Sequence, residues 1–186
     1  QNKKEIREGR KEGFDWGPVK KDSIKRINKE VLEIGVGRGD TARELAKTNK
    51  LYCSDISKVG LEEVSECCED TFLSKNIKQA PPVDLAISHL TFQHCHEQEV
   101  IRILNDVNLK DGARFSFQFA ALDLQKTRLT DIILNDLNEA MLYFYSYDKM
   151  IGLVNQTNKK MSRAVGPFWF DAPFSFNWYI FQVKNR

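Results

Sequence analysis

Two acidic residues and three glycines are spaced so that they could bind a nucleoside. The glycines are Gly35, Gly37 and Gly39, Glu33 lies two residues before the first of them, and Asp55 follows it by twenty residues. A glycine turn lets main-chain N–H groups approach a ligand closely. A carboxylate accepts hydrogen bonds from the vicinal hydroxyls of a ribose. The grouping therefore predicts a nucleoside-binding loop, although a tight structural turn also uses glycines.

The residues around the glycines predict the elements that position this loop. Residues 31–34 form a mostly apolar strand, and residues 41–47 place Ala42, Leu45 and Ala46 on one face of a helix. A second apolar strand, residues 51–54, leads directly into Asp55. Both acidic residues are therefore expected on neighbouring strands, near the carboxyl ends.

The glycine spacing differs from the G-x-G-x-x-G pattern of dinucleotide-binding proteins, because Asp40 stands where that pattern has its third glycine. The series Glu33-x-Gly35-x-Gly37-x-Gly39, together with Asp55, instead resembles the class I S-adenosylmethionine-dependent methyltransferases. The resemblance extends from about residue 24 to the end of the chain.

The resemblance implies S-adenosylmethionine as the cofactor and gives several residues a role in binding it. Glu33 would face the methionine ammonium group, the backbone of Gly35, Gly37 and Gly39 would run along the donor, and Asp55 would bind the ribose. The further cofactor-binding residues are Asn76 and Ser88. Asn76 falls roughly where the family often has a polar side chain near the adenine amine, and an exposed loop asparagine is the alternative.

All three histidines lie within a short segment after the predicted fourth strand, residues 83–88. His94 matches a loop of the family that reads roughly L-x-x-H, and His89 is nearer the strand end. Either imidazole could act as a general base toward a hydroxyl acceptor, or could only line the pocket or cap the next helix. The histidine spacings of five and two match no zinc pattern, so no metal site is predicted.

The rest of the chain alternates between strands and helices. We expect further strands at 71–73 and 113–120, a hairpin of residues 163–170 and 174–183, and helices at 58–68, 97–107, 129–141 and 146–155. The predicted fold is an α/β three-layer sandwich with a mostly parallel seven-stranded sheet and a C-terminal antiparallel hairpin. Such a hairpin distinguishes the resembled fold from the dinucleotide-binding one.

Two predictions concern which side chains these elements bury. In the helix at 58–68 we expect Val59, Leu61 and Val64 to face the core. In the strand at 113–120 the phenylalanines share one face, and Ser116 and Gln118 point the other way. Gln118 could contact the substrate or could be a buried amide with satisfied hydrogen bonds.

The chain divides into an N-terminal arm or lid, residues 1–23, and an S-adenosylmethionine-binding domain, residues 24–186. Phe14 and Trp16 could cover the pocket, as the resemblance implies, or could pack on the domain surface. Residues 1–30 hold ten Lys and Arg against six Asp and Glu. Because the charges are interleaved, a solvated arm is a simpler interpretation than a nucleic-acid-binding segment.

Composition narrows the class of protein. The chain of 186 residues is 41% hydrophobic, which suits one domain with a sizeable core. No apolar run approaches the roughly 18 residues of a membrane span, so no membrane association is expected. The four cysteines form no C-x-x-C pair, which favours a reducing cytoplasm.

The sequence therefore predicts an S-adenosylmethionine-dependent methyltransferase that acts on the oxygen or nitrogen of a small molecule. Enzymes that methylate amines of nucleic-acid bases resemble one another in an Asn/Asp-Pro-Pro-aromatic tetrapeptide after the fourth strand. Residues 88–91 read Ser-His-Leu-Thr instead, so a nucleic-acid partner is not expected. A non-catalytic module that binds adenosylmethionine or a partner, and an NAD(P)-dependent oxidoreductase, are the alternatives. The oligomeric state stays open.

Overall fold

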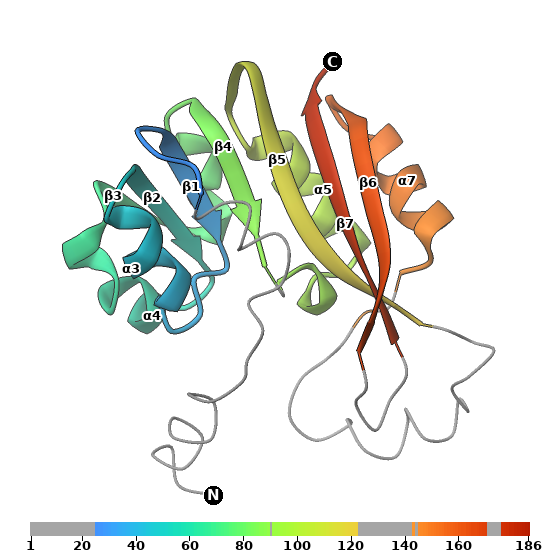
Figure 1. Cartoon of the computed structure of the whole chain (residues 1–186), viewed down its shortest axis with the longest axis horizontal. Helices are drawn as coiled ribbons and strands as arrows, with labels where there is room; N and C mark the ends of the chain where they lie inside the picture. The colour runs from blue at the N-terminus through green and yellow to red at the C-terminus, as the bar shows by residue number, and fades with distance from the viewer. Residues whose placement is uncertain (1–24, 90, 123–142, 144, 171–175) are drawn as a thin grey trace, which may run out of the picture.

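One seven-stranded sheet organises the protein (Figure 1). The computed structural model describes residues 25–89, 91–122, 143, 145–170 and 176–186. The strands are β1 (Glu30–Ile34), β2 (Lys50–Asp55), β3 (Asp70–Leu73), β4 (Val83–Ser88), β5 (Leu109–Leu122), β6 (Lys159–Phe170) and β7 (Phe176–Asn185).

The sheet has the order β3-β2-β1-β4-β5-β7-β6. The first five strands are parallel, and β7 runs antiparallel to both of its neighbours, β5 and β6. This arrangement confirms the predicted fold class, including the C-terminal antiparallel hairpin. The carboxyl ends of β1, β2 and β4 consequently meet at one edge of the sheet.

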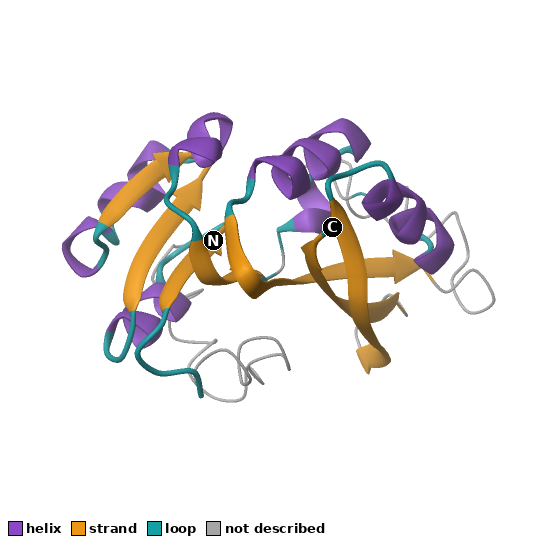
Figure 2. Cartoon of the chain, turned by 90° about the horizontal axis from the view of Figure 1, so that it is seen from above, coloured by secondary structure: helices purple, strands orange, loops and turns teal. Residues whose placement is uncertain are grey.

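Helices cover the two faces of the sheet unequally (Figure 2). One face carries α5 and α7, and the other carries the short helices α3 and α4 over the β1–β2 side. The helices are α3 (Asp40–Ala46), α4 (Lys58–Glu62), α5 (Glu97–Asp106), α7 (Tyr147–Asn155), η1 (Ser65–Cys67), η2 (Ser74–Gln79) and η3 (Phe92–His94).

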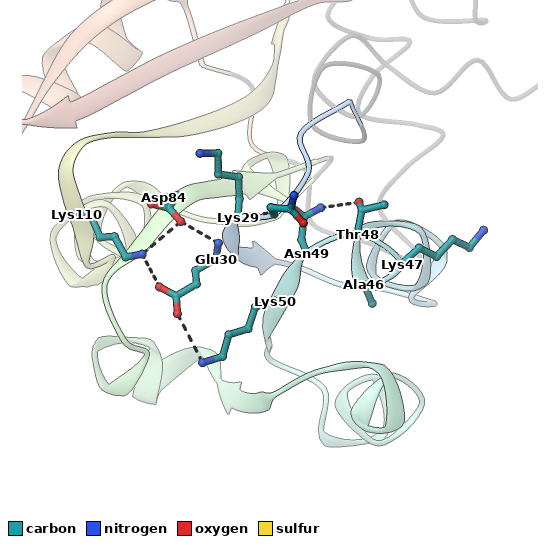
Figure 3. A pocket seen from close by; sticks show the side chains of 10 residues that line it. Lys29, Glu30, Ala46, Lys47, Thr48, Asn49, Lys50, Asp84 and Lys110 are labelled. Atoms are coloured by element: carbon teal, nitrogen blue, oxygen red, sulfur yellow. Dashed lines mark hydrogen bonds and ion pairs between the residues drawn. The ribbon is translucent and has the colours of Figure 1, made fainter.

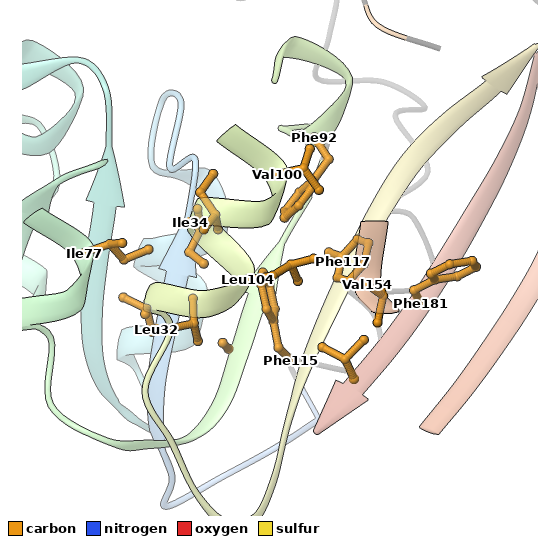
Figure 4. Close-up of a cluster of buried hydrophobic side chains, with 14 of the residues drawn as sticks. Leu32, Ile34, Ile77, Phe92, Val100, Leu104, Phe115, Phe117, Val154 and Phe181 are labelled. Atoms are coloured by element: carbon orange, nitrogen blue, oxygen red, sulfur yellow. The ribbon is translucent and has the colours of Figure 1, made fainter. Parts of the chain in front are cut away.

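The larger core cluster lies on the face that α5 and α7 cover (Figure 4). Val100 and Leu104 of α5 are four residues apart and are fully buried against it, as the helical period requires. Phe115, Phe117 and Phe119 of β5 also belong to this cluster and are fully buried. The predicted alternation of side chains along β5 is confirmed.

The helix predicted at 58–68 is shorter than expected. It ends at Glu62, and the separate 3-10 helix η1 follows it. Leu61 and Val64 are buried as predicted, but Val59 is 65% exposed, so that part of the prediction is wrong. A Cβ on Gly60 would lie 3.2 Å from the carbonyl oxygen of Gly37. Gly60 thus faces inward together with Leu61, and this leaves Val59 on the outer side.

Some predicted segments lie outside the described residues. They are the N-terminal arm at 1–23, with Phe14 and Trp16, and the helix at 129–141. Among the helices that the structure describes, none has the length and apolar character needed to cross a membrane.

Candidate active site

The loop after β1 depends on glycine for its conformation. Gly35, Gly37 and Gly39 have φ values of 79°, 55° and 77°, in the left-handed region that favours glycine. The Gly35 N–H donates to the carbonyl of Ser54 on β2 at 2.7 Å, and the Gly39 N–H donates to the carbonyl of Val36 at 2.8 Å. The loop is therefore a defined turn that is fastened to the neighbouring strand.

Thr91 packs directly over this loop and was not identified from the sequence. A Cβ on Gly35 would lie 1.9 Å from the Thr91 hydroxyl oxygen, so only glycine leaves room for that side chain. The hydroxyl oxygen is 3.2 Å from the Ile34 carbonyl and 3.3 Å from the His89 carbonyl. Because a hydroxyl has one proton, the two carbonyls share it. Thr91 thereby joins the segment after β4 to the end of β1.

Asp55 lies at the carboxyl end of β2, beside the glycine loop. One carboxylate oxygen accepts a hydrogen bond from the Gly37 N–H at 3.2 Å, and the other accepts one from the Ser57 N–H at 2.8 Å. A Cβ on Gly37 would meet nothing within 4 Å. An acceptor-rich carboxylate thus lies next to exposed backbone with open space around it.

Glu33 is a buried carboxylate at the same edge of the sheet. It is 3% exposed, and its register partners are Cys53 on β2 and Ile87 on β4. Neighbours in register point to the same face of a sheet, and Cys53 and Ile87 belong to the core cluster beneath α3 and α4. Glu33 therefore lies on the face that carries α3 and α4.

Ser88 is the last residue of β4, and its side chain lies on the other face. Its register partners are Ile34 and Phe117, which both belong to the cluster around α5. The residue is fully buried, and the hydroxyl has no hydrogen-bond partner among the described residues. Ser54 of β2 is the register partner of Ile34 on its other side, and its buried hydroxyl also has no hydrogen-bond partner among the described residues.

The predicted catalytic histidines lie on different parts of the segment after β4. His89 is the first residue past the strand and is partly buried, with an enclosed Nδ1 atom. His94 ends η3 and is exposed. Asn76 lies within η2, directly after β3, and is half-buried. Within the described ranges, no cluster of His, Cys, Asp or Glu side chains could hold a metal ion.

The structure therefore brings together most of the predicted site residues. Glu33, the glycine loop, Asp55 and His89 come from β1, β2 and β4 and meet at the carboxyl edge of the sheet. We call this region the carboxyl edge. His94 is displaced along η3, and the Ser88 side chain lies on the opposite face of the sheet from Glu33.

The opposite edge of the sheet, at the amino ends of β1 and β4, contains an open hollow of about 560 Å³ (Figure 3). We call this region the amino edge. The Lys110 ammonium is 2.5 Å from Glu30 and 3.3 Å from Asp84, and Lys50 is 3.6 Å from Glu30. The backbone N–H of Glu30 also donates to Asp84 at 2.9 Å.

These contacts shift the pKa values of the ionisable groups at the amino edge. The Lys110 ammonium lowers the pKa of the Glu30 carboxyl, and the Glu30 N–H, followed by Lys110, lowers the pKa of the Asp84 carboxyl. The two carboxylates in turn raise the pKa of Lys110. Glu30, Lys50, Asp84 and Lys110 thus form one network of ion pairs beside the hollow. None of the residues that the glycine motif predicted lines it.

No protein-family model matches the sequence, and the comparison with curated proteins also finds no match. Solved structures do match. An S-adenosylmethionine-dependent methyltransferase from Methanosarcina mazei has a TM-score of 0.70 at 14% identity, with 92% of this chain and 99% of that chain covered. A TehB-like S-adenosylmethionine-dependent methyltransferase from Corynebacterium glutamicum has a TM-score of 0.68 at 12% identity, covering 98% and 95%.

Magnesium protoporphyrin IX methyltransferase from Synechocystis PCC 6803, solved with bound S-adenosylhomocysteine, has a TM-score of 0.62 at 17% identity. The match covers 90% of this chain and 78% of that chain. At these identities the likeness concerns the fold. The chain has the fold of the class I S-adenosylmethionine-dependent methyltransferases, as its glycine motif and closing hairpin predicted.

Proposed function

We propose that this protein transfers the methyl group of S-adenosylmethionine to an oxygen or nitrogen atom of a small molecule. The observation that carries the proposal is the meeting of Glu33, three left-handed glycines and Asp55 at the carboxyl ends of adjacent strands. In open α/β sheets, ligands bind at this edge, where strands diverge to either side.

The residues present fit the cofactor. Asp55 offers acceptor oxygens to the ribose hydroxyls beside the open backbone at Gly37. Glu33 is buried, and a buried carboxylate is stabilised by a cationic partner such as the methionine ammonium. The glycine turn brings main-chain groups close to the donor between these two acids. Asn76, directly after β3, would lie on the adenine side.

The bound cofactor supplies an activated methyl group, so the protein mainly has to align the acceptor and exclude water. His89 lies at the end of β4, beside the glycine loop to which Thr91 joins it. With a hydroxyl acceptor, the imidazole of His89 would take the proton, and His94 is the second candidate for this role. An amine acceptor needs only to arrive deprotonated.

Two observations favour a small molecule as the methyl acceptor. Residues 88–91 lack the Asn/Asp-Pro-Pro-aromatic tetrapeptide typical of nucleic-acid amine methyltransferases. The similar Synechocystis enzyme is also named for a small-molecule substrate.

We place the protein in the cytoplasm, because its four cysteines are free thiols.

Titration calorimetry with S-adenosylmethionine, S-adenosylhomocysteine and NAD tests the cofactor. We expect both adenosyl compounds to bind and NAD not to bind. Asp55→Ala should weaken adenosyl binding by about 1–3 kcal/mol, as expected for hydrogen bonds to a charged group. The matched control is Asp84→Ala, which removes a carboxylate from the amino edge and should leave the affinity unchanged.

Two outcomes would contradict the proposal. Binding of NAD without binding of the adenosyl compounds would favour an oxidoreductase. Binding of the adenosyl compounds, with no methyl transfer to any phenol, carboxylic acid or amine in an acceptor screen, would favour a non-catalytic binding module.

A further inference from the structure

Two side chains of β5, Ser116 and Gln118, each bury an oxygen atom that has no hydrogen-bond partner among the described residues. Ser116 is 4% exposed and Gln118 is 5% exposed. Within the part of the chain that the structure describes, the Ser116 hydroxyl oxygen and the Gln118 carbonyl oxygen accept no hydrogen bond. A buried polar group without a partner costs free energy, so its presence calls for an explanation.

Their position on β5 places both side chains on the face that carries Glu33. Ser116 is in register with Ile87, which is in register with Glu33. Residues in one row of a parallel sheet share a face, and two strand spacings separate Ser116 from Glu33 by about 10 Å. Gln118 lies two residues further along β5 and therefore faces the same way.

Gln118 also extends past the carboxyl end of β4. Phe117 is in register with Ser88, the last residue of β4, so Gln118 lies one position beyond that strand, level with His89. The phenylalanines of β5 pack on the opposite face, together with α5 and α7. The Gln118 side chain thus lies on the face that carries Glu33, next to the strand end that adjoins the glycine loop.

We propose that Gln118 and Ser116 bind the polar group of the methyl acceptor, an inference that rests on the proposed function. The Gln118 carbonyl oxygen would accept a hydrogen bond from an O–H or N–H of the acceptor, and the Ser116 hydroxyl would bind a second polar atom. The acceptor class is therefore a small molecule with a hydrogen-bond donor at or next to the methylated atom. A ligand of this kind would supply the hydrogen-bond partner that the described residues do not provide.

Side-chain amide NMR of the protein saturated with S-adenosylhomocysteine tests this inference. The probes are phenol and benzylamine. Toluene is the control compound, because it has a similar ring but no hydrogen-bond donor. The Gln118 amide signals are assigned by their loss in Gln118→Leu. We expect phenol or benzylamine to shift these signals and toluene to leave them in place. In Gln118→Leu, binding of the active probe should weaken by about tenfold, the size of one hydrogen bond.

Gln79→Leu, at the exposed end of η2, is the control variant and should leave probe binding unchanged. Gln118→Leu should keep or raise the melting temperature, because it removes a buried carbonyl oxygen that has no partner among the described residues. A clear fall in melting temperature, or no response of the Gln118 signals to either donor, would overturn the inference. If S-adenosylhomocysteine itself does not bind the unaltered protein, the proposed function fails instead.

Discussion

The carboxyl edge and the amino edge of the sheet differ in how far the fold satisfies its own polar groups. At the amino edge, Glu30, Asp84 and Lys110 pair with one another around the hollow. At the carboxyl edge, three glycines adopt left-handed conformations, and the buried Gln118 carbonyl oxygen has no hydrogen-bond partner among the described residues. An unpaired buried polar atom is a cost that proteins retain at functional sites. The site that we propose lies at the edge where buried polar atoms have no partner among the described residues, and the evident hollow lies at the other edge.

The two edges should also respond differently to mutation. Side chains at the amino edge are about one-third exposed, so their ion pairs contribute little to stability. At the carboxyl edge, Thr91 packs directly against Gly35 of the glycine loop, so a change there should affect both folding and the proposed binding.

The largest effect is expected from Gly35→Ala. The new Cβ would lie 1.9 Å from the Thr91 hydroxyl, and φ is 79°. Overpacking and backbone strain together should lower the free energy of unfolding by about 4 kcal/mol, which urea denaturation measures. The matched control is Gly112→Ala, at φ 74° with nothing within 4 Å of the Cβ. It should cost only about 1–2 kcal/mol. Equal losses would mean that the contact with Thr91 is unimportant.

The next effect concerns the shared hydrogen bond of Thr91. Thr91→Val keeps the shape of the side chain but releases the carbonyls of Ile34 and His89 from the hydroxyl. S-adenosylhomocysteine binding should weaken by about tenfold, as for the loss of one hydrogen bond. Thr91→Ser keeps the hydroxyl and should bind almost normally. If calorimetry gives both variants the affinity of the unaltered protein, Thr91 does not couple the glycine loop to the segment after β4.

A smaller effect is expected at the amino edge. Lys110→Met removes the ammonium group that pairs with Glu30 and Asp84. The melting temperature should fall slightly, and the affinity for S-adenosylhomocysteine should stay the same. A marked loss of affinity would mean that the amino edge contributes to cofactor binding. The two edges would then not differ in function.

The smallest effect is a change in the pH dependence of stability. The folded protein lowers the pKa of Glu30 and Asp84 from ordinary values of 4.5 and 3.8. Their contribution is therefore fully present above about pH 5 and is lost as the pH falls through the lowered values. The stability difference between the unaltered protein and Lys110→Met should shrink as urea denaturation is repeated from pH 6 to pH 3. A stability difference that does not change with pH would mean that ionisation of Glu30 and Asp84 does not cause it.

Most of the fold could be predicted from the sequence, because each strand carries its own signal. The apolar runs, the phenylalanine alternation along β5 and the closing hairpin of β6 and β7 all depend on near neighbours in the chain. The face of α4 could not be predicted. It depends on the close approach of Gly60 to the Gly37 carbonyl, a contact between distant residues.

The candidate site divides in the same way. The glycines and Asp55 follow a spacing that is readable along the chain, and the structure places them together. Thr91 gave no sequence signal, since its role arises from packing over Gly35. For Gln118 the sequence left two interpretations open, and only the absence of a partner among the described residues favours a ligand contact.

The position of β7 in the sheet has a consequence for synthesis of the chain. β7 follows β6 in sequence but lies between β5 and β6, with Phe115 opposite Val183 and Leu122 opposite Phe176. A ribosome therefore releases β6 before the strand that links it to the rest of the sheet exists. During that interval the long edge of β5 stays unpaired, and an open strand edge is a template for association with other chains. Aggregation of the nascent protein should therefore depend on how quickly the last strand emerges and inserts.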